Sequence, residues 1–412
     1  MTVHHPPTDE QGPGVLDIPF PGSFHLDPAP TWTRLREDCP VTQVRTLSGD
    51  VVWLVTRYQD VRTVLADARF SRAGTVAAGA PQVAVARPLP GTLPTTDPPE
   101  HTRLRRLVSG AFSHRRVETM RPWIRELAGN LADDIAAAGT HELPVDLRVT
   151  FALPLPIRVI CHLLGVPYGD RDRFRVWTEL AYSMQSDEAD RVRDAMAQLT
   201  AYLRELVEAK RAELAGRAAL DILDELILAD VDGDRLDTDE LAAFGMNLLV
   251  AGHETSANQI TSFVATLLRE PALWDRLAAE PALLPGAVEE LLRHTRLSEM
   301  GQLRVAAEDV VLGGQLIRAG EGVMAALSSA NRDPSVFDRP EQVLLDREPG
   351  RHLAFGTGPH FCLGAHLARV ELQEALAALL ARFPGLRLAV PAEQLRWRRV
   401  LVSGVAELPV RW

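Results

Sequence analysis

The segment Phe355-Gly356-Thr357-Gly358-Pro359-His360-Phe361-Cys362-Leu363-Gly364 places one cysteine in a glycine-rich loop that runs directly into a helical pattern. A cysteine that binds a metal must stay deprotonated, and amide N–H donors and nearby positive charge favour the thiolate. The helix expected after Gly364 would direct its partial positive charge at the sulfur. The three glycines let the backbone turn tightly and approach a flat ligand, and Phe355 would pack beside the sulfur. The loop therefore predicts that Cys362 is the thiolate ligand of a haem iron.

The other two cysteines, Cys39 and Cys161, lack such surroundings, and we interpret them as small buried hydrophobes. Three cysteines without regular spacing give no disulfide framework, which is typical of a reducing cytosol. The formal net charge of −11 disfavours nucleic acid or an anionic membrane as a partner. The sequence shows neither a secretion signal nor an uninterrupted apolar stretch of spanning length, so we expect a soluble, cytoplasmic protein.

Helical periodicity dominates after about residue 100, and short strand patterns lie at 51–55, 310–317 and 386–410. These strands are scattered along the chain and no linker separates them, so they are expected to meet in one domain. We predict a mainly α fold with small β-sheets (α+β) over residues 30–412. Residues 1–29, rich in proline, glycine and histidine, are predicted to form a flexible N-terminal segment.

The segment 244–258 is apolar nearly all round, yet it carries an acid and an alcohol, Glu254 and Thr255, at its middle. This pattern predicts a buried helix whose polar groups have a function. The Thr255 hydroxyl can reach back to the Ala251 carbonyl and, because Gly252 has no side chain, open a groove able to hold dioxygen and a water. A zinc site of the His-Glu-x-x-His type is disfavoured because the second histidine is missing. A helix kink with a buried threonine is the purely structural alternative.

Four residues of the cysteine loop, Phe355, Gly358, Cys362 and Gly364, match the signature Phe-x-x-Gly-x-x-x-Cys-x-Gly, and the chain thereby resembles the cytochrome P-450 family. The resemblance covers about residues 30 to 410. It implies a single-domain cytochrome P-450 fold with haem b (iron protoporphyrin IX), held between the helix of 244–258 and the helix after the loop.

The resemblance also implies roles for residues outside the cysteine loop. The stretch from Ala251 to Thr255 is similar to the family's Ala-Gly-x-Glu/Asp-Thr motif, whose acid and alcohol deliver protons to bound oxygen. Buried haem propionates need cations or strong donors. Four residues match the family positions that hold them: His101, Arg105, Arg304 and His360. The pair Glu290 and Arg293 matches a structural Glu-x-x-Arg motif, with Arg347 or His352 as its third member.

The segments 97–106 and 331–334 look most like soluble actinobacterial enzymes that tailor secondary metabolites such as macrolides, including those of antibiotic biosynthesis. This likeness implies a monooxygenase that hydroxylates or epoxidises an apolar natural product of macrolide, polyketide or peptide type, using O2. No nicotinamide or flavin motif follows a strand, so ferredoxin and ferredoxin reductase are the expected electron donors. The candidate docking residues are Arg103, Arg106, Arg115, Arg116 and Arg369, with scattered solvated charge as the alternative.

The substrate side is predicted only as regions of the chain. The regions that the resemblance places there are residues 74–94, residues 297–302, the helix face at Asn247, Leu248 and Ala251, and residues 400–403. Two other functions stay open. One is oxidative C–C or C–N coupling of aromatic substrates without oxygen insertion. The other is a haem sensor or carrier without chemistry, which Glu254 and Thr255 disfavour because a carrier gains nothing from proton delivery.

Overall fold

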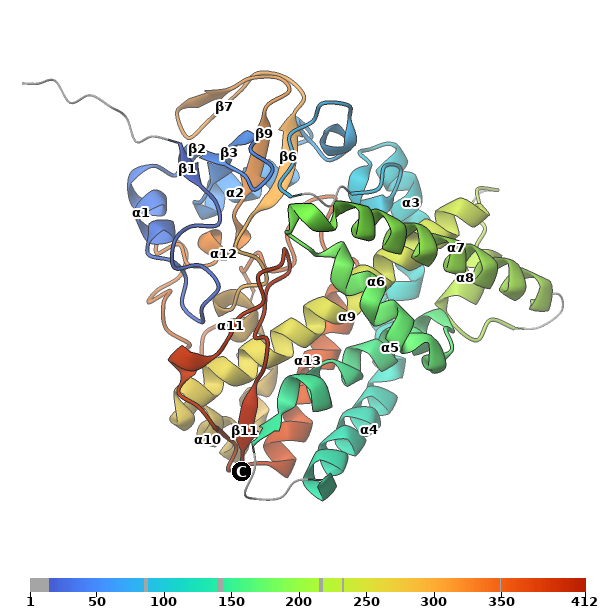
Figure 1. Cartoon of the computed structure of the whole chain (residues 1–412), viewed down its shortest axis with the longest axis vertical. Helices are drawn as coiled ribbons and strands as arrows, with labels where there is room; N and C mark the ends of the chain where they lie inside the picture. The colour runs from blue at the N-terminus through green and yellow to red at the C-terminus, as the bar shows by residue number, and fades with distance from the viewer. Residues whose placement is uncertain (1–14, 85–87, 139–143, 215–217, 232, 349) are drawn as a thin grey trace, which may run out of the picture.

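The computed structural model describes residues 15–84, 88–138, 144–214, 218–231, 233–348 and 350–412. Helices fill one side of the molecule, and most strands gather at the other (Figure 1). The helices are α1 (Thr31–Asp38), α2 (Tyr58–Ala66), α3 (Glu100–Ser109), α4 (His114–Ala138), α5 (Pro154–Leu164), α6 (Arg171–Ala181), α7 (Ala189–Glu213), α8 (Ile222–Leu228), α9 (Thr238–Arg269), α10 (Pro271–Ala279), α11 (Leu284–His294), α12 (Leu327–Ala330) and α13 (Ala365–Arg382). This confirms the predicted mainly α class.

The strands form small sheets. They are β1 (Leu16–Asp17), β2 (Val41–Arg45), β3 (Val51–Val55), β4 (Phe70–Ser71), β5 (Val145–Asp146), β6 (Gln302–Ala306), β7 (Val310–Leu312), β8 (Gln315–Ile317), β9 (Gly322–Ala325), β10 (Arg387–Leu388) and β11 (Pro409–Arg411). The largest sheet has the order β1-β2-β3-β9-β6-β4, a second has β10-β11-β5, and β7 pairs with β8. Segments from the start, middle and end of the chain therefore share sheets within one fold.

The strand patterns expected at 51–55 and 310–317 are confirmed, and both lie in antiparallel hairpins. Strand β3 pairs antiparallel with β2, with Val52 opposite Val44. Strand β7 pairs antiparallel with β8, and the turn residues Gly313 and Gly314 have φ angles of 55° and 80°. These positive angles are open to glycine at low cost, which explains the Gly-Gly pair.

The packed part of the chain begins before the predicted boundary at residue 30. Strand β1 pairs in parallel with β2, with Leu16 opposite Val44. Ile18 and Phe20 are buried in a core cluster with residues of β2 and β3. Apolar burial thus draws residues 15–29 into the fold although their proline and glycine content predicts flexibility. Residues 1–14 lie outside the described part of the chain.

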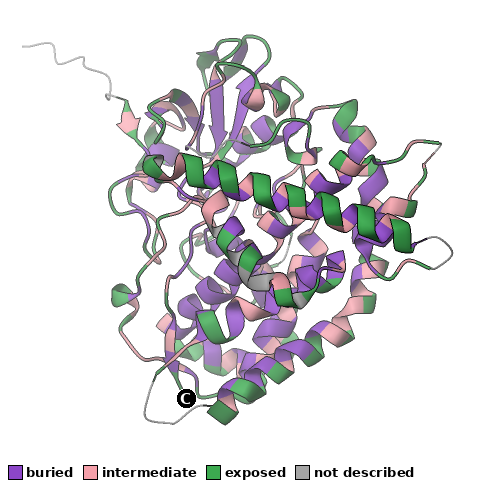
Figure 2. Cartoon of the chain, turned by 45° about the vertical axis from the view of Figure 1, so that its right-hand side comes forward, coloured by how far each residue is buried: buried purple, intermediate pink, exposed green. Residues whose placement is uncertain are grey.

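Helix α9 lies at the centre of the helical side, where it packs against α5, α7 and α13 (Figure 1). Its start is fixed by a capping box, in which Asp237 accepts from the Glu240 N–H and the Glu240 carboxylate accepts from the Asp237 N–H. The predicted buried helix 244–258 lies wholly inside it. Surface helices such as α7 instead bury one face only (Figure 2). None of the helices within the described ranges is long and apolar enough to cross a membrane.

Candidate active site

The cysteine loop requires glycine at two of its positions. Gly356 and Gly358 have φ angles of 71° and 73°, a region that other residues rarely adopt. A Cβ atom at Gly358 would also stand 2.7 Å from the carbonyl oxygen of Leu65, which no rotamer change relieves. The Cys362 N–H donates to the Phe355 carbonyl over 2.9 Å and closes the loop. The positive φ angles thus account for both glycines, and close packing against the C-terminal end of α2 is a second reason for Gly358.

The sulfur of Cys362 lies at the N-terminal end of α13, as the sequence predicts. Solvent reaches the Cys362 side chain, yet the surrounding protein atoms desolvate it, and this burial raises the pKa of the thiol. Three groups act in the opposite sense: the Gly364 N–H, which bonds the sulfur, and the guanidinium groups of Arg105 and Arg369. The loop therefore presents one sulfur to which donors and cations are already directed.

Three of the four predicted propionate ligands lie together, and two of them bury an atom that has no partner among the described residues. The rings of His101 and His360 are 4.2 Å apart, and His101 and Arg304 are 3 % and 1 % exposed. His101 Nε2 and Arg304 Nη2 are buried without a hydrogen-bond partner in the described structure. Burial lowers the pKa of His360 to about 3 and that of Arg304 to about 9, with neighbouring positive groups adding to both shifts. Such donors fit an anionic ligand, and the carboxylates of haem meet that requirement.

The fourth predicted ligand, Arg105, contacts the cysteine loop itself. Its Nη1 donates to the Phe361 carbonyl over 2.8 Å. A further cation that the sequence does not indicate, Arg72, lies beside Arg304. It donates to the carbonyl oxygens of Pro94 and Leu303 at 2.7 and 3.0 Å. Burial lowers the pKa of Arg72 to about 10. No local pattern marks Arg72, because long-range folding alone brings it to Arg304.

On α9 the alcohol forms the predicted hydrogen bond. Thr255 Oγ1 donates to the Ala251 carbonyl over 2.5 Å. The helix nevertheless runs unbroken from Thr238 to Arg269. A Cβ at Gly252 would approach Ile160 Cδ1 of α5 to 3.0 Å, so the missing side chain at Gly252 allows close packing of two helices.

The acid of α9 is held by two arginines that the sequence analysis did not anticipate. Glu254 is 1 % exposed, and its Oε1 accepts from Arg148 Nη2 over 2.9 Å and also contacts Arg398. Arg148 further donates to Asn258 Oδ1 over 2.7 Å. The other oxygen, Glu254 Oε2, is buried without a hydrogen-bond partner in the described structure. In the described structure, Oε1 of Glu254 thus lies in ion pairs, whereas Oε2 can still bond another group.

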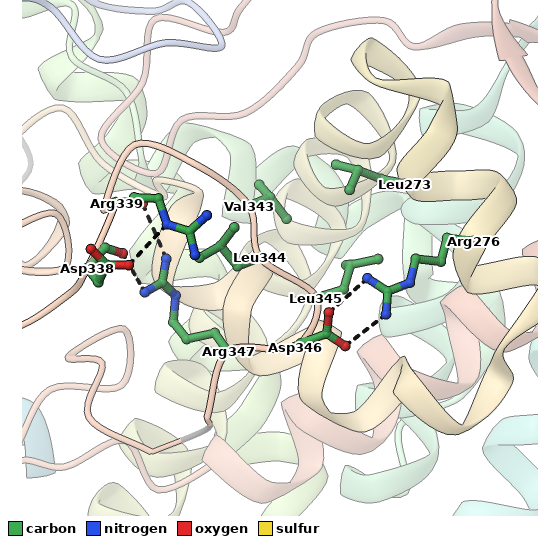
Figure 3. Close-up of a pocket in the computed structure, with 9 residues that line it drawn as sticks. All are labelled: Leu273, Arg276, Asp338, Arg339, Val343, Leu344, Leu345, Asp346 and Arg347. Carbon is green, nitrogen blue, oxygen red and sulfur yellow. Dashed lines mark hydrogen bonds and ion pairs between the residues drawn. The ribbon is translucent and has the colours of Figure 1, made fainter.

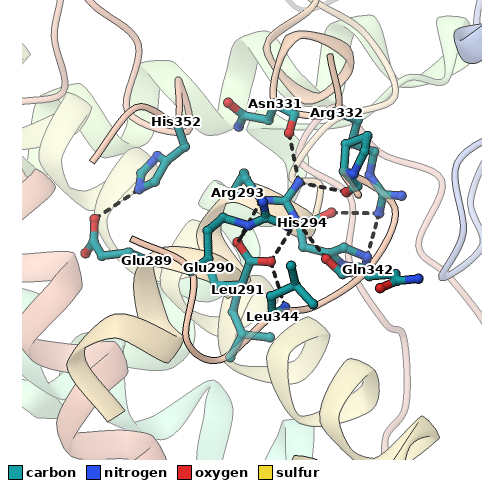
Figure 4. Close-up of polar contacts among 12 residues, drawn as sticks. Glu289, Glu290, Leu291, Arg293, His294, Asn331, Arg332, Gln342, Leu344 and His352 are labelled. Carbon is teal, nitrogen blue, oxygen red and sulfur yellow. Dashed lines mark hydrogen bonds and ion pairs between the residues drawn. The ribbon is translucent and has the colours of Figure 1, made fainter. Parts of the chain in front are cut away.

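The Glu-x-x-Arg pair, Glu290 and Arg293, is buried on α11 (Figure 4). Arg347 is its third member. Glu290 Oε2 accepts from Arg293 Nε and Arg347 Nε at 2.7 and 2.8 Å, and Glu290 Oε1 accepts from the Leu344 N–H at 2.9 Å. His352, the other candidate, instead contacts Glu289 at 3.0 Å. The network ties α11 to the segment that precedes the cysteine loop.

Three of the four predicted substrate regions line one cavity of about 210 Å³. Its residues from these regions are Thr75, Gln82, Val83, Ala84, Pro88, Ser298, Met300, Gly301, Gln302 and Leu401. Within the first region, residues 85–87 lie outside the described residues. A larger recess of about 450 Å³ lies elsewhere and is lined by Leu273, the Arg276–Asp346 pair and residues 338, 339, 343–345 and 347 (Figure 3). Paired surface charges of that kind supply no group for oxygen chemistry.

The arginines expected to dock an electron donor are largely paired within the chain. Arg369 binds both oxygens of Glu289 at 2.7 and 2.9 Å, and Arg116 pairs with Glu225 at 2.6 Å. Arg103 contacts Glu100 at 2.9 Å, and other acids surround it. Arg115 is exposed on the first turn of α4. Of the predicted patch, Arg115 is therefore the best candidate for a contact with another protein.

A cysteine loop at a helix N-terminus, buried donors suited to propionates and a buried acid–alcohol helix together define a haem-thiolate protein. The family model for cytochrome P-450 matches residues 174–387. The chain belongs to this family, whose cofactor is haem (iron protoporphyrin IX). It is a haem-thiolate monooxygenase.

Relatives agree over nearly the whole chain. Nocardicin C N-oxygenase of Nocardia uniformis subsp. tsuyamanensis is 46 % identical over 96 % of this chain and 98 % of its own length. Mycinamicin IV hydroxylase/epoxidase of Micromonospora griseorubida is 45 % identical over 96 % and 98 %. The crystal structure of the LnmA cytochrome P-450 hydroxylase from the leinamycin biosynthetic pathway of Streptomyces atroolivaceus is 47 % identical, covers 97 % of this chain and 100 % of its own, and superposes with a TM-score of 0.86.

Proposed function

We propose that this monooxygenase hydroxylates or epoxidises an apolar natural product of macrolide, polyketide or peptide type in the biosynthesis of a secondary metabolite. Ferredoxin and ferredoxin reductase supply the electrons, and the protein works in the cytoplasm without a membrane or nucleic-acid partner. The relatives named above are a nocardicin C N-oxygenase, a mycinamicin IV hydroxylase/epoxidase and a hydroxylase from the leinamycin biosynthetic pathway, and their similarity extends over the substrate regions. Residues 30–412 form the catalytic domain together with the packed residues from 15 onward.

The observation that carries the proposal is the cysteine loop at Cys362 together with buried donors that have no partner in the part of the chain that the structure describes. His101 and Arg304 each bury a donor atom without a partner in the described structure, at a cost that an anionic ligand offsets. When bound, haem with a thiolate ligand supplies the activation of dioxygen. We assign Cys362 as the metal ligand, and we assign the remaining cofactor contacts to His101, Arg105, Arg304, His360, Phe355 and Gly364.

We assign proton delivery to Glu254 and Thr255 of α9. The Thr255 hydroxyl donates to the Ala251 carbonyl and keeps oxygen lone pairs that accept from a water. Glu254 Oε2 is the atom that takes up and releases a proton, because Oε1 is occupied by Arg148 and Arg398. Gly252 allows α5 and α9 to pack closely and so holds Glu254 and Thr255 in place.

The cavity lined by three of the predicted substrate regions suits an apolar substrate. Val83, Met300 and Leu401 line it together with a few polar groups, the usual composition of a small-molecule site. A substrate larger than about 210 Å³ requires the surrounding segments to move apart.

The test is a screen of candidate metabolites for the absorption change that follows displacement of the iron-bound water, followed by product analysis with a surrogate ferredoxin pair. The proposal predicts products heavier than substrate by one oxygen atom, labelled when the gas is isotopically labelled O2. A product whose mass equals the sum of two joined substrates less two hydrogens, without added oxygen, would indicate oxidative coupling instead. Binding of substrates without any product would favour the sensor or carrier.

A further inference from the structure

Two histidines and a glutamate meet on the surface formed by α4 and α13. His114 and Glu118 stand four residues apart on the first turns of α4, and His366 lies on the first turn of α13. The rings of His114 and His366 are stacked, with centroids 4.2 Å apart and planes inclined by 26°. His366 Nε2 is 3.0 Å from Glu118 Oε1. One potential ligand atom from each residue lies within 4.8 Å of the other two.

The packing of the two helices produces this cluster. Residues four apart on a helix project from the same face, so His114 and Glu118 reach the same neighbour on α13. His114 is exposed, whereas Glu118 and His366 are partly buried, so an ion can enter from solvent. None of these residues belongs to the sets that bind haem or deliver protons.

Arg121 is the charged group that competes with a cation here. It donates to both oxygens of Glu118, at 2.7 Å from Nε to Oε2 and at 2.9 Å from Nη2 to Oε1. Arg121 also donates to Glu374 over 2.8 Å, so it has a second carboxylate. A carboxylate oxygen has more than one lone pair, and Glu118 can therefore keep Arg121 while one oxygen turns to a metal.

We propose that His114, Glu118 and His366 bind one divalent transition-metal ion, of which Zn²⁺ fits best. Two imidazole nitrogens and one carboxylate oxygen, with a fourth position open to water, are a regular zinc ligand set. Mg²⁺ and Ca²⁺ prefer oxygen ligands and would not be held by this set. Ligand atoms around tetrahedral zinc are roughly 3.4 Å apart, which small rotations of the exposed His114 side chain achieve.

The location gives such an ion a consequence for the site. His366 follows Cys362 by four residues, so the ion would add positive charge on the thiolate side of the molecule, beside Arg115. The binding proposal itself does not depend on the substrate or on the electron donor, because it concerns a surface cluster that can be measured without turnover.

The experiment is a calorimetric titration of the full-length haem protein with Zn²⁺ and, separately, with Mg²⁺. Because His4 and His5 form an adjacent pair outside the described residues, all variants carry both histidines replaced by alanine. The test variants are H114A and H366A, and the matched control is H25A, which removes an exposed histidine elsewhere.

The expected result is one Zn²⁺ per chain in the background protein and in H25A, at least about tenfold weaker binding in H114A and H366A, and no binding of Mg²⁺. Equal zinc affinity in all three variants would overturn the proposal, as would equal binding of Mg²⁺. Zinc-edge X-ray absorption provides a second readout, with two imidazole ligands expected in the background protein and one in H114A. If H366A loses haem because it lies near Cys362, H114A, on the other helix, decides the matter.

Discussion

Arg148 Nη2 lies 2.9 Å from Glu254 Oε1, and both side chains are almost wholly buried, at 4 % and 1 % exposed. One residue precedes α5 and the other belongs to α9, so the contact joins the central helix to its neighbour. A buried ion pair gains little over an apolar pair, but the loss of one partner leaves a charge without compensation. Glu254, the acid expected to deliver protons, therefore also helps to hold the fold together.

Replacing Arg148 with methionine should lower the free energy of unfolding by about 3 kcal/mol, because the buried Glu254 then keeps, among the described residues, Arg398 alone as a counter-charge, and Arg398 is partly exposed. The matched control is Arg396→Met, which removes an exposed arginine paired with Glu407 and should cost under about 1 kcal/mol. Denaturant unfolding of both variants measures the difference. Equal losses would show that the Arg148 pair adds nothing.

Replacing Thr255 with alanine should uncouple electron consumption from product formation. The variant loses the hydroxyl assigned to proton delivery, and product formed per electron should fall at least roughly tenfold, with peroxide released instead. Thr200→Ala is the matched control, since Thr200 on α7 makes the same type of bond, to the Met196 carbonyl over 2.8 Å. If electron consumption and product formation stay coupled in both variants, the Thr255 hydroxyl serves only to bond the Ala251 carbonyl of its own helix.

Glu289 should make stability depend on pH in the acid range. Burial alone would raise its pKa, but hydrogen bonds from His352 and Arg369 outweigh burial and lower the pKa from 4.5 to about 2. A carboxyl with a lowered pKa in the folded state stabilises the fold above its unfolded pKa, and this contribution disappears as pH falls through the folded value.

Glu289→Gln should therefore be less stable than the native protein at about pH 7, and the gap should narrow from about pH 4.5 down to about pH 2. Replacing the exposed Glu393 by glutamine should leave a small gap at every pH. Unfolding free energies measured across this range are the readout. A gap for Glu289→Gln that widens with acidification contradicts the assignment.

Reversing the charge of Arg115 should weaken the use of a protein electron donor. Arg115→Glu is expected to reduce ferredoxin-supported kcat/KM roughly tenfold at low salt while turnover with peroxide is unchanged. Arg193→Glu, on the exposed face of α7, serves as the control and should affect neither assay. Parallel losses with ferredoxin and peroxide would point to damage of the active site rather than of docking.

Local chemistry explains what could be predicted from the sequence. Positive φ angles make glycine necessary at 313 and 314, and the same requirement marks 356 and 358 in the cysteine loop. Helical spacing likewise predicts that Thr255 reaches Ala251 and that Glu290 reaches Arg293. Each of these contacts joins residues within a few positions of one another, where the period of the element fixes the geometry.

Long-range partners explain what could not be predicted. Arg148 and Arg398 meet at Glu254 from opposite parts of the chain, and no pattern near Glu254 indicates either. The sequence likewise left Arg347 and His352 as alternatives for Glu290, because only the folded segment brings Arg347 to it. For the same reason, the arginines predicted to dock an electron donor are largely paired with acidic residues of this chain, as Arg369 is with Glu289.

The absorption spectrum of the reduced protein with carbon monoxide tests the central claim most directly. The native protein, Cys39→Ala and Cys161→Ala should all give the band of thiolate-ligated haem, and Cys362→Ala should lose it. A band of histidine-ligated haem in the native protein, or an unchanged thiolate band in Cys362→Ala, would contradict the account.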